Sequence, residues 1–131
     1  MGNIEPIDPR LDEVASKVVD AAFKVHTTLG PGLLEQIYEA SLAKELTNRG
    51  LRVMRQVEVP VVYDGEDLGI GLRLDMLVED GLIIEIKAVE NAQPVYLAQL
   101  LTYLKLTGHR LGLLINFNVR YIKDGVQRVV L

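Results

Sequence analysis

The sequence lacks several residue types on which enzymes commonly rely. Its 131 residues include no cysteine and no tryptophan, and only two histidines and two phenylalanines. Without cysteine the chain can form no disulfide, thiolate nucleophile or cysteine-based zinc site. His26 and His109 are far apart and belong to none of the spaced histidine motifs that bind zinc. Any chemistry must therefore depend on carboxylates, lysine and tyrosine, with or without a metal ion that oxygen atoms can bind.

Long apolar runs and an excess of positive charge are also missing. No apolar stretch reaches the ~18 residues of a membrane span, and the N-terminal residues lack the basic and apolar segments of a secretion signal. We therefore expect a cytoplasmic location and no membrane partner. The formal net charge of −4 argues against tight non-specific binding to nucleic acid, which depends on Lys and Arg at phosphates. It does not exclude a nuclease, because metal-binding carboxylates add negative charge until the metal binds.

Length and composition predict one folded domain. The hydrophobic fraction is 49% and the mean hydropathy is +0.19, values typical of packed globular chains. A chain of this length can bury about two-thirds of its unfolded surface. We predict a flexible lead-in over residues 1–10, which includes Pro6 and Pro9, and a single domain over residues 11–131.

The spacing of apolar residues changes along the chain from helical to alternating and back, which predicts an α/β (α+β) fold. Pro60 interrupts the first strand and therefore indicates an edge strand. The predicted order is α-α-β-β-β-α-β plus a C-terminal β-hairpin. The elements are helices at 11–29 and 33–49, three strands within 52–88 with turns at Asp64-Gly65 and near Asp80-Gly81, a helix at 93–107, a buried strand at 110–117, and a hairpin within 119–131 that turns at Asp124-Gly125.

Two carboxylates are predicted to face each other across the second turn. If residues 79–81 form a three-residue loop, Asp75 lies opposite Glu85, with side-chain roots roughly 4.5 to 5.5 Å apart. Lys87 then points to the same face, and the other face is wholly apolar. The apolar cross-strand pairs would be Leu74 with Ile86, Met76 with Ile84, and Val78 with Leu82. A two-residue turn would instead mix acidic and apolar residues on both faces, which a half-buried sheet resists.

Opposed carboxylates destabilise a strand pair unless something compensates their charge. A shared proton, a basic neighbour or a divalent cation could do so. Lys87 can offset part of the charge, and it could also orient a water or stabilise a phosphate in a transition state. The alternative is a solvated outer face on which Arg73, Asp75, Glu85 and Lys87 form ordinary salt bridges.

Three further polar residues have candidate roles. Glu35 projects onto the apolar side of its predicted helix, where a carboxylate needs a partner, although it would also suit the helix dipole in the first turn. Gln99 and Tyr103 are four residues apart and share a helix face. This face would lie opposite a core stripe of Leu97, Leu100, Leu101 and Leu104, and could look onto the acidic residues or form a subunit interface.

The remaining polar residues favour structural roles. His26 lies beside apolar residues of the first predicted helix and is interpreted as a hydrogen-bonded structural histidine. Arg49, Arg52 and Arg55 form a basic cluster that could attract phosphate, although such clusters are more often solvated turns.

Asp75 followed by Glu85-Ile86-Lys87 on adjacent strands, after a helix that carries Glu35, resembles the PD-(D/E)XK nuclease superfamily. More narrowly, the segment from Gly32 through Glu35 to Tyr38 resembles the motif that names the GxxExxY proteins. The resemblance covers nearly the whole chain, from about residue 11 to residue 130.

The resemblance implies a restriction-endonuclease-like core, in which helices flank a central mixed β-sheet and the acidic strands lie near its centre. It also implies Mg²⁺ or Mn²⁺ held by Asp75 and Glu85, with Glu35 and the backbone carbonyl of Ile86 as further candidate ligands. Lys87 would position or activate water, and Gln99 and Tyr103 resemble an accessory substrate-binding motif. The implied activity is metal-dependent hydrolysis of phosphodiester bonds in DNA or RNA, bound with modest affinity.

Two other functions fit parts of the sequence. A catalytically silent protein could keep this fold and act as a binding or partner module, which the acidic balance favours. A glycosidase could use the paired carboxylates, but without tryptophan the chain has little with which to stack a sugar. The Gln99–Tyr103 face and the C-terminal hairpin also make a homodimer an open alternative.

Overall fold

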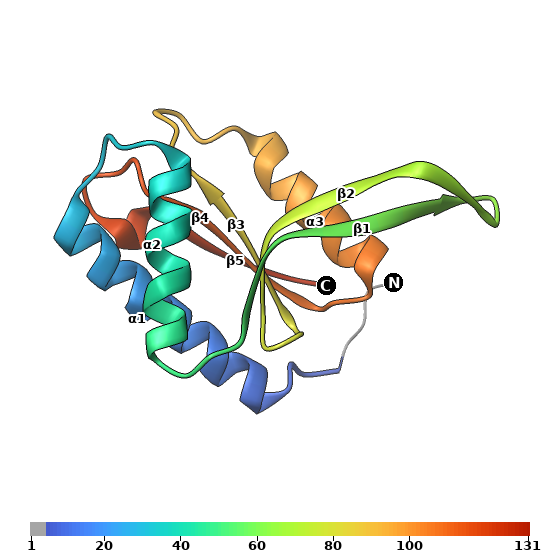
Figure 1. Ribbon diagram of the computed structural model, residues 1–131, viewed down its shortest axis with the longest axis horizontal. Coiled ribbons are helices and arrows are strands. Elements are labelled where there is room, and N and C mark those ends of the chain that lie inside the picture. The colour runs from blue at the N-terminus through green and yellow to red at the C-terminus, as the bar shows by residue number, and fades with distance from the viewer. Residues whose placement is uncertain (1–4) are drawn as a thin grey trace.

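A mixed five-stranded sheet with the order β1-β2-β3-β4-β5 forms the centre of the computed structural model, which describes residues 5–131 (Figure 1). β3 and β4 run parallel and the other neighbours run antiparallel. β1 lies at an edge, as Pro60 predicted, and β3 lies at the centre. The elements are α1 (Pro9–Leu29), α2 (Glu35–Asn48), β1 (Val53–Tyr63), β2 (Glu66–Val78), β3 (Leu82–Lys87), α3 (Pro94–Thr107), β4 (Leu111–Asn116), the 3₁₀ helix η1 (Ile122–Asp124) and β5 (Val126–Val130).

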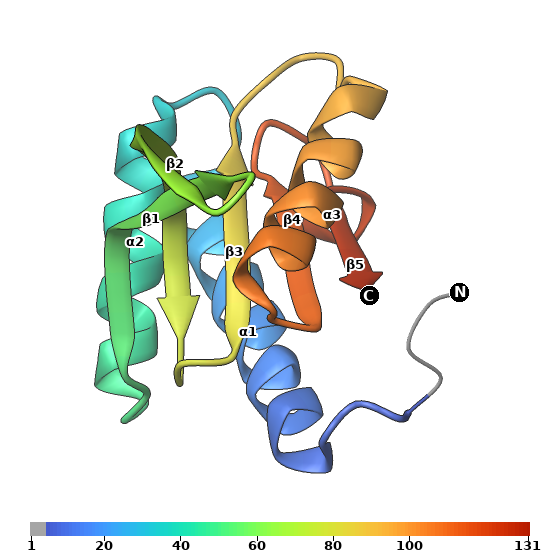
Figure 2. The same ribbon diagram turned by 90° about the vertical axis from the view of Figure 1, so that its right-hand side faces the viewer.

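Helices cover both faces of the sheet, and each face has its own apolar core. α1 and α2 pack on one face, where Ile84 and Ile86 of β3 contribute to the larger core, and α3 packs on the other, where Ile83 lies in one core with Leu100 and Leu104 (Figure 2). β4 is buried along its whole length. Burial on both sides explains why β3 and β4 are almost continuously apolar, because alternation is expected only when one face meets water.

The β2–β3 turn has the predicted three-residue loop. Met76 pairs with Ile84 and Val78 with Leu82, and Glu79 and Asp80 adopt φ angles of 51° and 53°. The ladder ends at Met76, however. The predicted pairing of Leu74 with Ile86 is therefore wrong, and Leu74 packs instead in the core beneath α3.

β2 twists at Asp75 because its N-terminal half leaves β3 and continues only with β1. Figure 1 shows these two strands extending past the rest of the sheet as an arm. Two-stranded ribbons twist more strongly than wide sheets, which explains the change of face at this point. The arm ends in the predicted Asp64-Gly65 turn, where both residues have positive φ angles as a type I′ hairpin requires.

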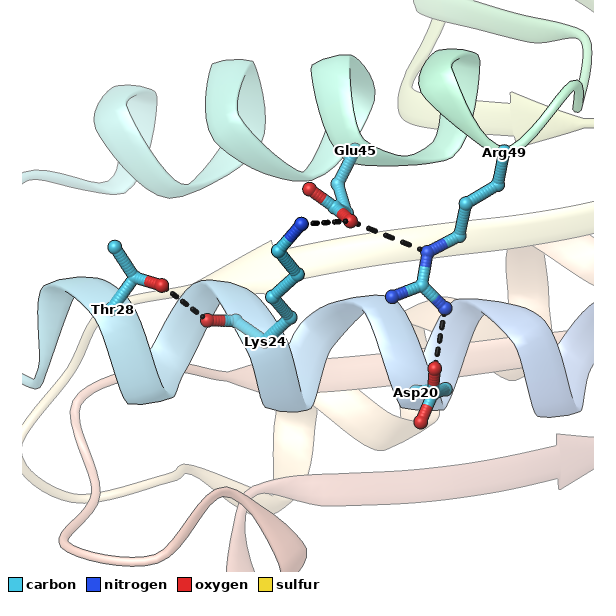
Figure 3. A network of polar contacts seen from close by, with 5 residues as sticks. All are labelled: Asp20, Lys24, Thr28, Glu45 and Arg49. Carbon is cyan, nitrogen blue, oxygen red and sulfur yellow. Dashed lines mark hydrogen bonds and ion pairs between the residues drawn. The ribbon is translucent and has the colours of Figure 1, made fainter.

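Ion pairs join α1 to α2 (Figure 3). Arg49 near the end of α2 binds Asp20 of α1, and Glu45 accepts from both Arg49 and Lys24. Thr28 Oγ1 donates to the Lys24 carbonyl within α1 at 2.9 Å. Solvent-exposed pairs contribute little stability each, so the apolar contacts between the helices carry most of the packing energy.

Both ends of the chain differ from the predictions. α1 begins at Pro9, two residues earlier than expected, where Asp8 caps the helix by accepting from the Arg10 amide. Residues 1–4 of the expected flexible lead-in lie outside the described residues.

Within residues 5–131 no helix has both the length and the apolarity to cross a membrane.

The predicted C-terminal hairpin within residues 119–131 is wrong. Only Val126–Val130 form a strand, which pairs with β4, while residues before it form η1. Ile122 is buried in the core, and a Cβ on Gly125 would lie 2.1 Å from the Asn116 carbonyl oxygen. Residues 119–125 therefore pack against β4 and α1, and this packing prevents them from forming a separate strand.

Candidate active site

Asp75 and Glu85 come together where β2 separates from β3. Asp75 Oδ2 accepts a hydrogen bond from the Ile86 amide at 2.8 Å, and Glu85 Oε1 accepts one from the Asp75 amide at 3.2 Å. Each carboxylate thus bonds to the opposite strand, at the first position beyond the regular ladder. The separation of the two strands leaves amides that the two acids satisfy, which fixes both side chains in place.

Charge at this pair is compensated by a proton when no cation is present. Glu85 is only 5% exposed. Burial, followed by the neighbouring Asp75 carboxylate, raises the pKa of Glu85 to about 8, and Lys87 only partly opposes the shift. Burial disfavours the charged form of a carboxyl group, and a second carboxylate nearby disfavours it further. Glu85 therefore holds a proton at neutral pH.

Lys87 lies at the C-terminal end of β3 and is half-buried. Its ammonium lies 4.6 Å from the centroid of the Tyr96 ring, a cation–π distance, rather than in an ion pair with either acid. Its positive charge nevertheless opposes part of the rise in pKa of both Glu85 and Glu35, so it acts on both carboxyl groups. Tyr96 was not among the residues predicted for the site. Its seven-residue spacing from Tyr103 is the sequence signal that could have placed it on this face.

Glu35 is the first residue of α2 and remains exposed, so its predicted place on the apolar side of that helix is wrong. The buried side consists of Tyr38, Glu39, Leu42, Ala43 and Leu46. Glu39 tolerates burial because Arg55 and Gln56 donate to its carboxylate at 2.8 and 2.7 Å. Burial raises the pKa of Glu35 and Asp75 raises it further, which places Glu35 at the margin of the acidic pair.

α3 turns Tyr103 toward the same acids. Burial raises the pKa of Tyr103, and the Glu85 and Asp75 carboxylates raise it further. Gln99 is exposed and lies one turn before Tyr103 on the same helix face. Of the predicted leucine stripe, Leu100 and Leu104 are buried, whereas Leu97 and Leu101 are exposed and the prediction for them is wrong. α3 lies over β4 and β5 along one narrow contact, which covers two of the four leucines.

Comparison with known proteins identifies the family. The sequence matches the family model of the PD-(D/E)XK nuclease superfamily over residues 12–129. The chain belongs to the PD-(D/E)XK nuclease superfamily. Its mixed sheet flanked by helices confirms the restriction-endonuclease-like fold that the sequence predicted.

Two solved structures are similar over most of the chain. The crystal structure of an alkaline exonuclease, LHK-Exo, from Laribacter hongkongensis has 17% identity and a TM-score of 0.46, covering 92% of this chain and 81% of that one. LHK-Exo in complex with dAMP has 18% identity and a TM-score of 0.47, covering 88% and 82%. A search of curated proteins found no match.

In this PD-(D/E)XK chain the paired acids suit a hard metal ion. Asp75 and Glu85 offer carboxylate oxygens on adjacent strands, and the backbone carbonyl of Ile86 follows Glu85 directly. Mg²⁺ and Mn²⁺ prefer oxygen ligands, and Mg²⁺ commonly keeps several waters while one or two carboxylates bind it. Among residues 5–131 no three His, Asp or Glu side chains cluster closely enough to hold a metal. Glu35 therefore does not complete a three-carboxylate cluster.

The other predicted polar residues lie in structural contacts. His26 is buried, and its Nε2 lies 2.7 Å from the Val119 carbonyl oxygen, as expected for a structural histidine. The basic cluster does not form a free phosphate-binding patch. Arg49 pairs with Asp20 and Glu45, Arg52 with Glu79 and Asp80, and Arg55 with Glu39.

Proposed function

We propose that this PD-(D/E)XK protein is a metal-dependent nuclease that hydrolyses phosphodiester bonds in DNA or RNA. The main support is the acidic pair. Each of its two carboxylates accepts a hydrogen bond from a backbone amide of the opposite strand. The raised pKa of Glu85 favours a proton on that carboxylate at neutral pH unless a cation replaces it. Asp75 and Glu85 would hold Mg²⁺ or Mn²⁺, with the Ile86 carbonyl as a further ligand. A bound metal would stabilise negative charge on the phosphate and make a water more acidic.

The surrounding residues would hold the substrate and the water. The Lys87 ammonium can donate to a phosphate oxygen or to the attacking water, and the Tyr96 ring limits its range of positions. The Tyr103 hydroxyl can donate a hydrogen bond to a phosphate oxygen, and burial beside the two acids raises its pKa further from neutral pH. Gln99 can contact substrate from the same helix face. Glu35, at the exposed margin, can orient a water beside the acidic pair.

We further infer that the chain is a GxxExxY protein, because the geometry explains that motif. Gly32 has a φ angle of 97°, which favours glycine, in the turn before α2. The Tyr38 hydroxyl donates to the Gly30 carbonyl at 2.6 Å and accepts from the Leu33 amide at 3.1 Å. Glycine and tyrosine thus hold the turn that presents Glu35 at the start of α2.

Cleavage assays with one matched variant test this proposal. Single- and double-stranded DNA and RNA would be incubated with Mn²⁺ and wild type, Lys87→Ala or Lys105→Ala, an exposed lysine that forms no ion pair within residues 5–131. We expect Lys87→Ala to lose about 100-fold in rate, the scale for removing one charge-stabilising donor, and Lys105→Ala to match wild type. Equal rates in both variants would remove Lys87 from the mechanism. The absence of wild-type cleavage would refute the nuclease assignment.

A thermal-shift titration tests the metal site separately. Mn²⁺ at about 100 times its dissociation constant should stabilise the wild type by about 2.7 kcal/mol. Asp75→Asn should lose most of this effect while keeping an oxygen that can accept from the Ile86 amide. A metal-dependent shift without cleavage would instead favour a catalytically silent partner module.

A further inference from the structure

A cavity of about 370 Å³ lies between the C-terminal half of α1, the turn that follows it and the loop that leads into η1. In Figure 1 this loop lies beside the C-terminal end of α1. Its walls include Phe23, Gly30-Pro31, Arg120, Tyr121 and Lys123. We call it the basic aromatic pocket.

The pocket is locally positive in a chain whose net charge is −4. The residues that line it include Arg120 and Lys123 and no carboxylate. Neither cation forms an ion pair within residues 5–131, in contrast to Arg49, Arg52 and Arg55. Two unpaired cations beside one cavity attract an anion, and phosphate is the anion that this protein's proposed substrates carry along their length.

Exposed aromatic rings lie beside these cations. Tyr121 is 53% exposed and Phe23 is 43% exposed, so part of each side chain is accessible to a ligand. The Arg120 guanidinium lies 5.2 Å from the centroid of the Tyr121 ring. Aromatic rings that stack on bases, next to cations that contact the backbone, are the combination that binds single-stranded nucleic acid without reading its sequence.

The loop that carries Arg120 and Tyr121 is held in place by contacts with other elements. The His26 ring bonds to the Val119 carbonyl at 2.7 Å, Ile122 is buried in the core, and the Asn116 amide donates to the Gly125 carbonyl at 2.8 Å. These contacts hold the loop on both sides of Arg120 and Tyr121. A ligand would therefore meet side chains on a backbone that is already ordered, which lowers the entropy cost of binding.

The pocket and the candidate active site are near neighbours. The Phe117 amide donates to the Lys87 carbonyl at 2.9 Å, and the loop that carries Arg120 follows directly. On the other side, four residue steps separate Pro31 of the pocket from Glu35, which limits their Cα distance to about 14 Å. Lys87 faces α3 and the pocket lies on the α1 side, so a single strand that joins them passes around the end of the sheet, and the short backbone distances keep this path to a few nucleotides.

We propose that the basic aromatic pocket binds a single-stranded nucleic acid through two phosphates and one base, a few nucleotides from the bond that is cut. This inference rests on the proposed nuclease function in one respect: the bound strand is taken to continue from the pocket to Lys87 because cleavage is proposed there. Arg120 and Lys123 contact phosphates and Tyr121 stacks on a base. DNA and RNA share both features, so separate oligonucleotides distinguish them.

Fluorescence anisotropy in EDTA measures this binding without cleavage. Labelled 12-nucleotide oligo-dT and oligo-rU would be titrated with wild type, Arg120→Ala/Lys123→Ala, Tyr121→Ala and the control Arg10→Ala/Lys44→Ala. The control removes the same charge from exposed residues that form no ion pair within residues 5–131. We expect the pocket double variant to bind on the order of tenfold more weakly at 0.1 M salt, with a salt slope reduced by about 1.4 for two lost phosphate contacts.

Tyr121→Ala should also weaken binding on the order of tenfold, but with the salt slope unchanged, because stacking releases no counterions. The control should bind like wild type. Equal losses in the control and the pocket double variant would overturn the inference, as would a wild type that binds neither oligonucleotide. Melting temperatures near that of wild type would show that the exposed substitutions leave the fold intact.

Cleavage of 4- and 12-nucleotide substrates separates this inference from the proposed function. We expect the pocket variants to lose activity on the longer substrate and to match wild type on the shorter one. Unchanged activity on both lengths, with a functional wild type, would refute the pocket and leave the nuclease standing. Pocket-dependent binding without any wild-type cleavage would support the pocket and refute the nuclease.

Discussion

Without metal, the wild type is expected to lose stability at alkaline pH. The Glu85→Gln substitution should abolish this loss. Glu85 is buried beside Asp75, and its pKa is raised from 4.5 to about 8 in the folded chain. Between these pH values the folded chain holds a proton that the unfolded chain has lost. The resulting stabilisation is complete below about pH 4.5 and disappears as the pH rises through 8.

The size of the effect follows from the two pKa values. The proton on Glu85 should contribute about 3 kcal/mol more to the free energy of unfolding at pH 5.5 than at pH 8.5. In a chain of this length that difference corresponds to about 10 °C in melting temperature. The Glu85→Gln variant lacks this component, because its amide side chain is neutral at both pH values and can still accept from the Asp75 amide.

Thermal unfolding in EDTA at pH 5.5 and 8.5 provides the measurement. The difference between wild type and Glu85→Gln cancels titration that the two proteins share, including that of the histidines. In wild type, Mg²⁺ or Mn²⁺ should stabilise more strongly at pH 8.5, because binding at pH 5.5 must also displace the proton. Identical pH dependence in the two proteins would refute the reasoning that Glu85 is protonated at neutral pH.

Three further substitutions test the surroundings of the site through chemical unfolding. Arg55→Ala should cost about 1.5 to 3 kcal/mol, because it removes the half-exposed cation that donates to the buried Glu39 carboxylate, which keeps only its bond from Gln56; a loss below about 0.5 kcal/mol would contradict this. Tyr38→Phe should cost about 1 to 2 kcal/mol through the loss of its two hydrogen bonds, and unchanged stability would contradict the motif's role in holding the turn. Gly125→Ala should cost at least about 2 kcal/mol, because its Cβ would overlap a carbonyl oxygen of β4. An unchanged free energy of unfolding would show that this contact relaxes.

The acidic hairpin could be predicted from the sequence because its determinants are local. An odd loop at residues 79–81 and the alternation around it set the register up to Met76 with Ile84, and beyond that pair the hydrogen bonds of Asp75 and Glu85 to the opposite strand keep the two acids close. The burial of β4 on both sides was predictable for the same reason, since its sequence is apolar as far as Ile115. These predictions need only the two-residue period of a strand.

Predictions about contacts between distant segments were less successful. The position of Glu35 on α2 could not be read from helical periodicity, because Arg55 and Gln56 of β1 make burial of Glu39 favourable and so change the buried face. Leu74 changes face because β2 leaves β3 to form the arm, and the C-terminal segment packs against α1 rather than on itself.

The sequence by itself determined the order of the elements as far as β4, the hairpin register from Met76 to Ile84 and the residues that carry the family motif. Only the tertiary structure decided that Tyr96 contacts Lys87 and that burial beside Asp75 raises the pKa of Glu85. It also decided that Arg120 and Lys123, which form no ion pair within residues 5–131, lie beside exposed aromatic rings. The physical reason is that strand and helix periodicity acts over a few residues. Burial and charge compensation depend instead on whichever segments the fold brings alongside.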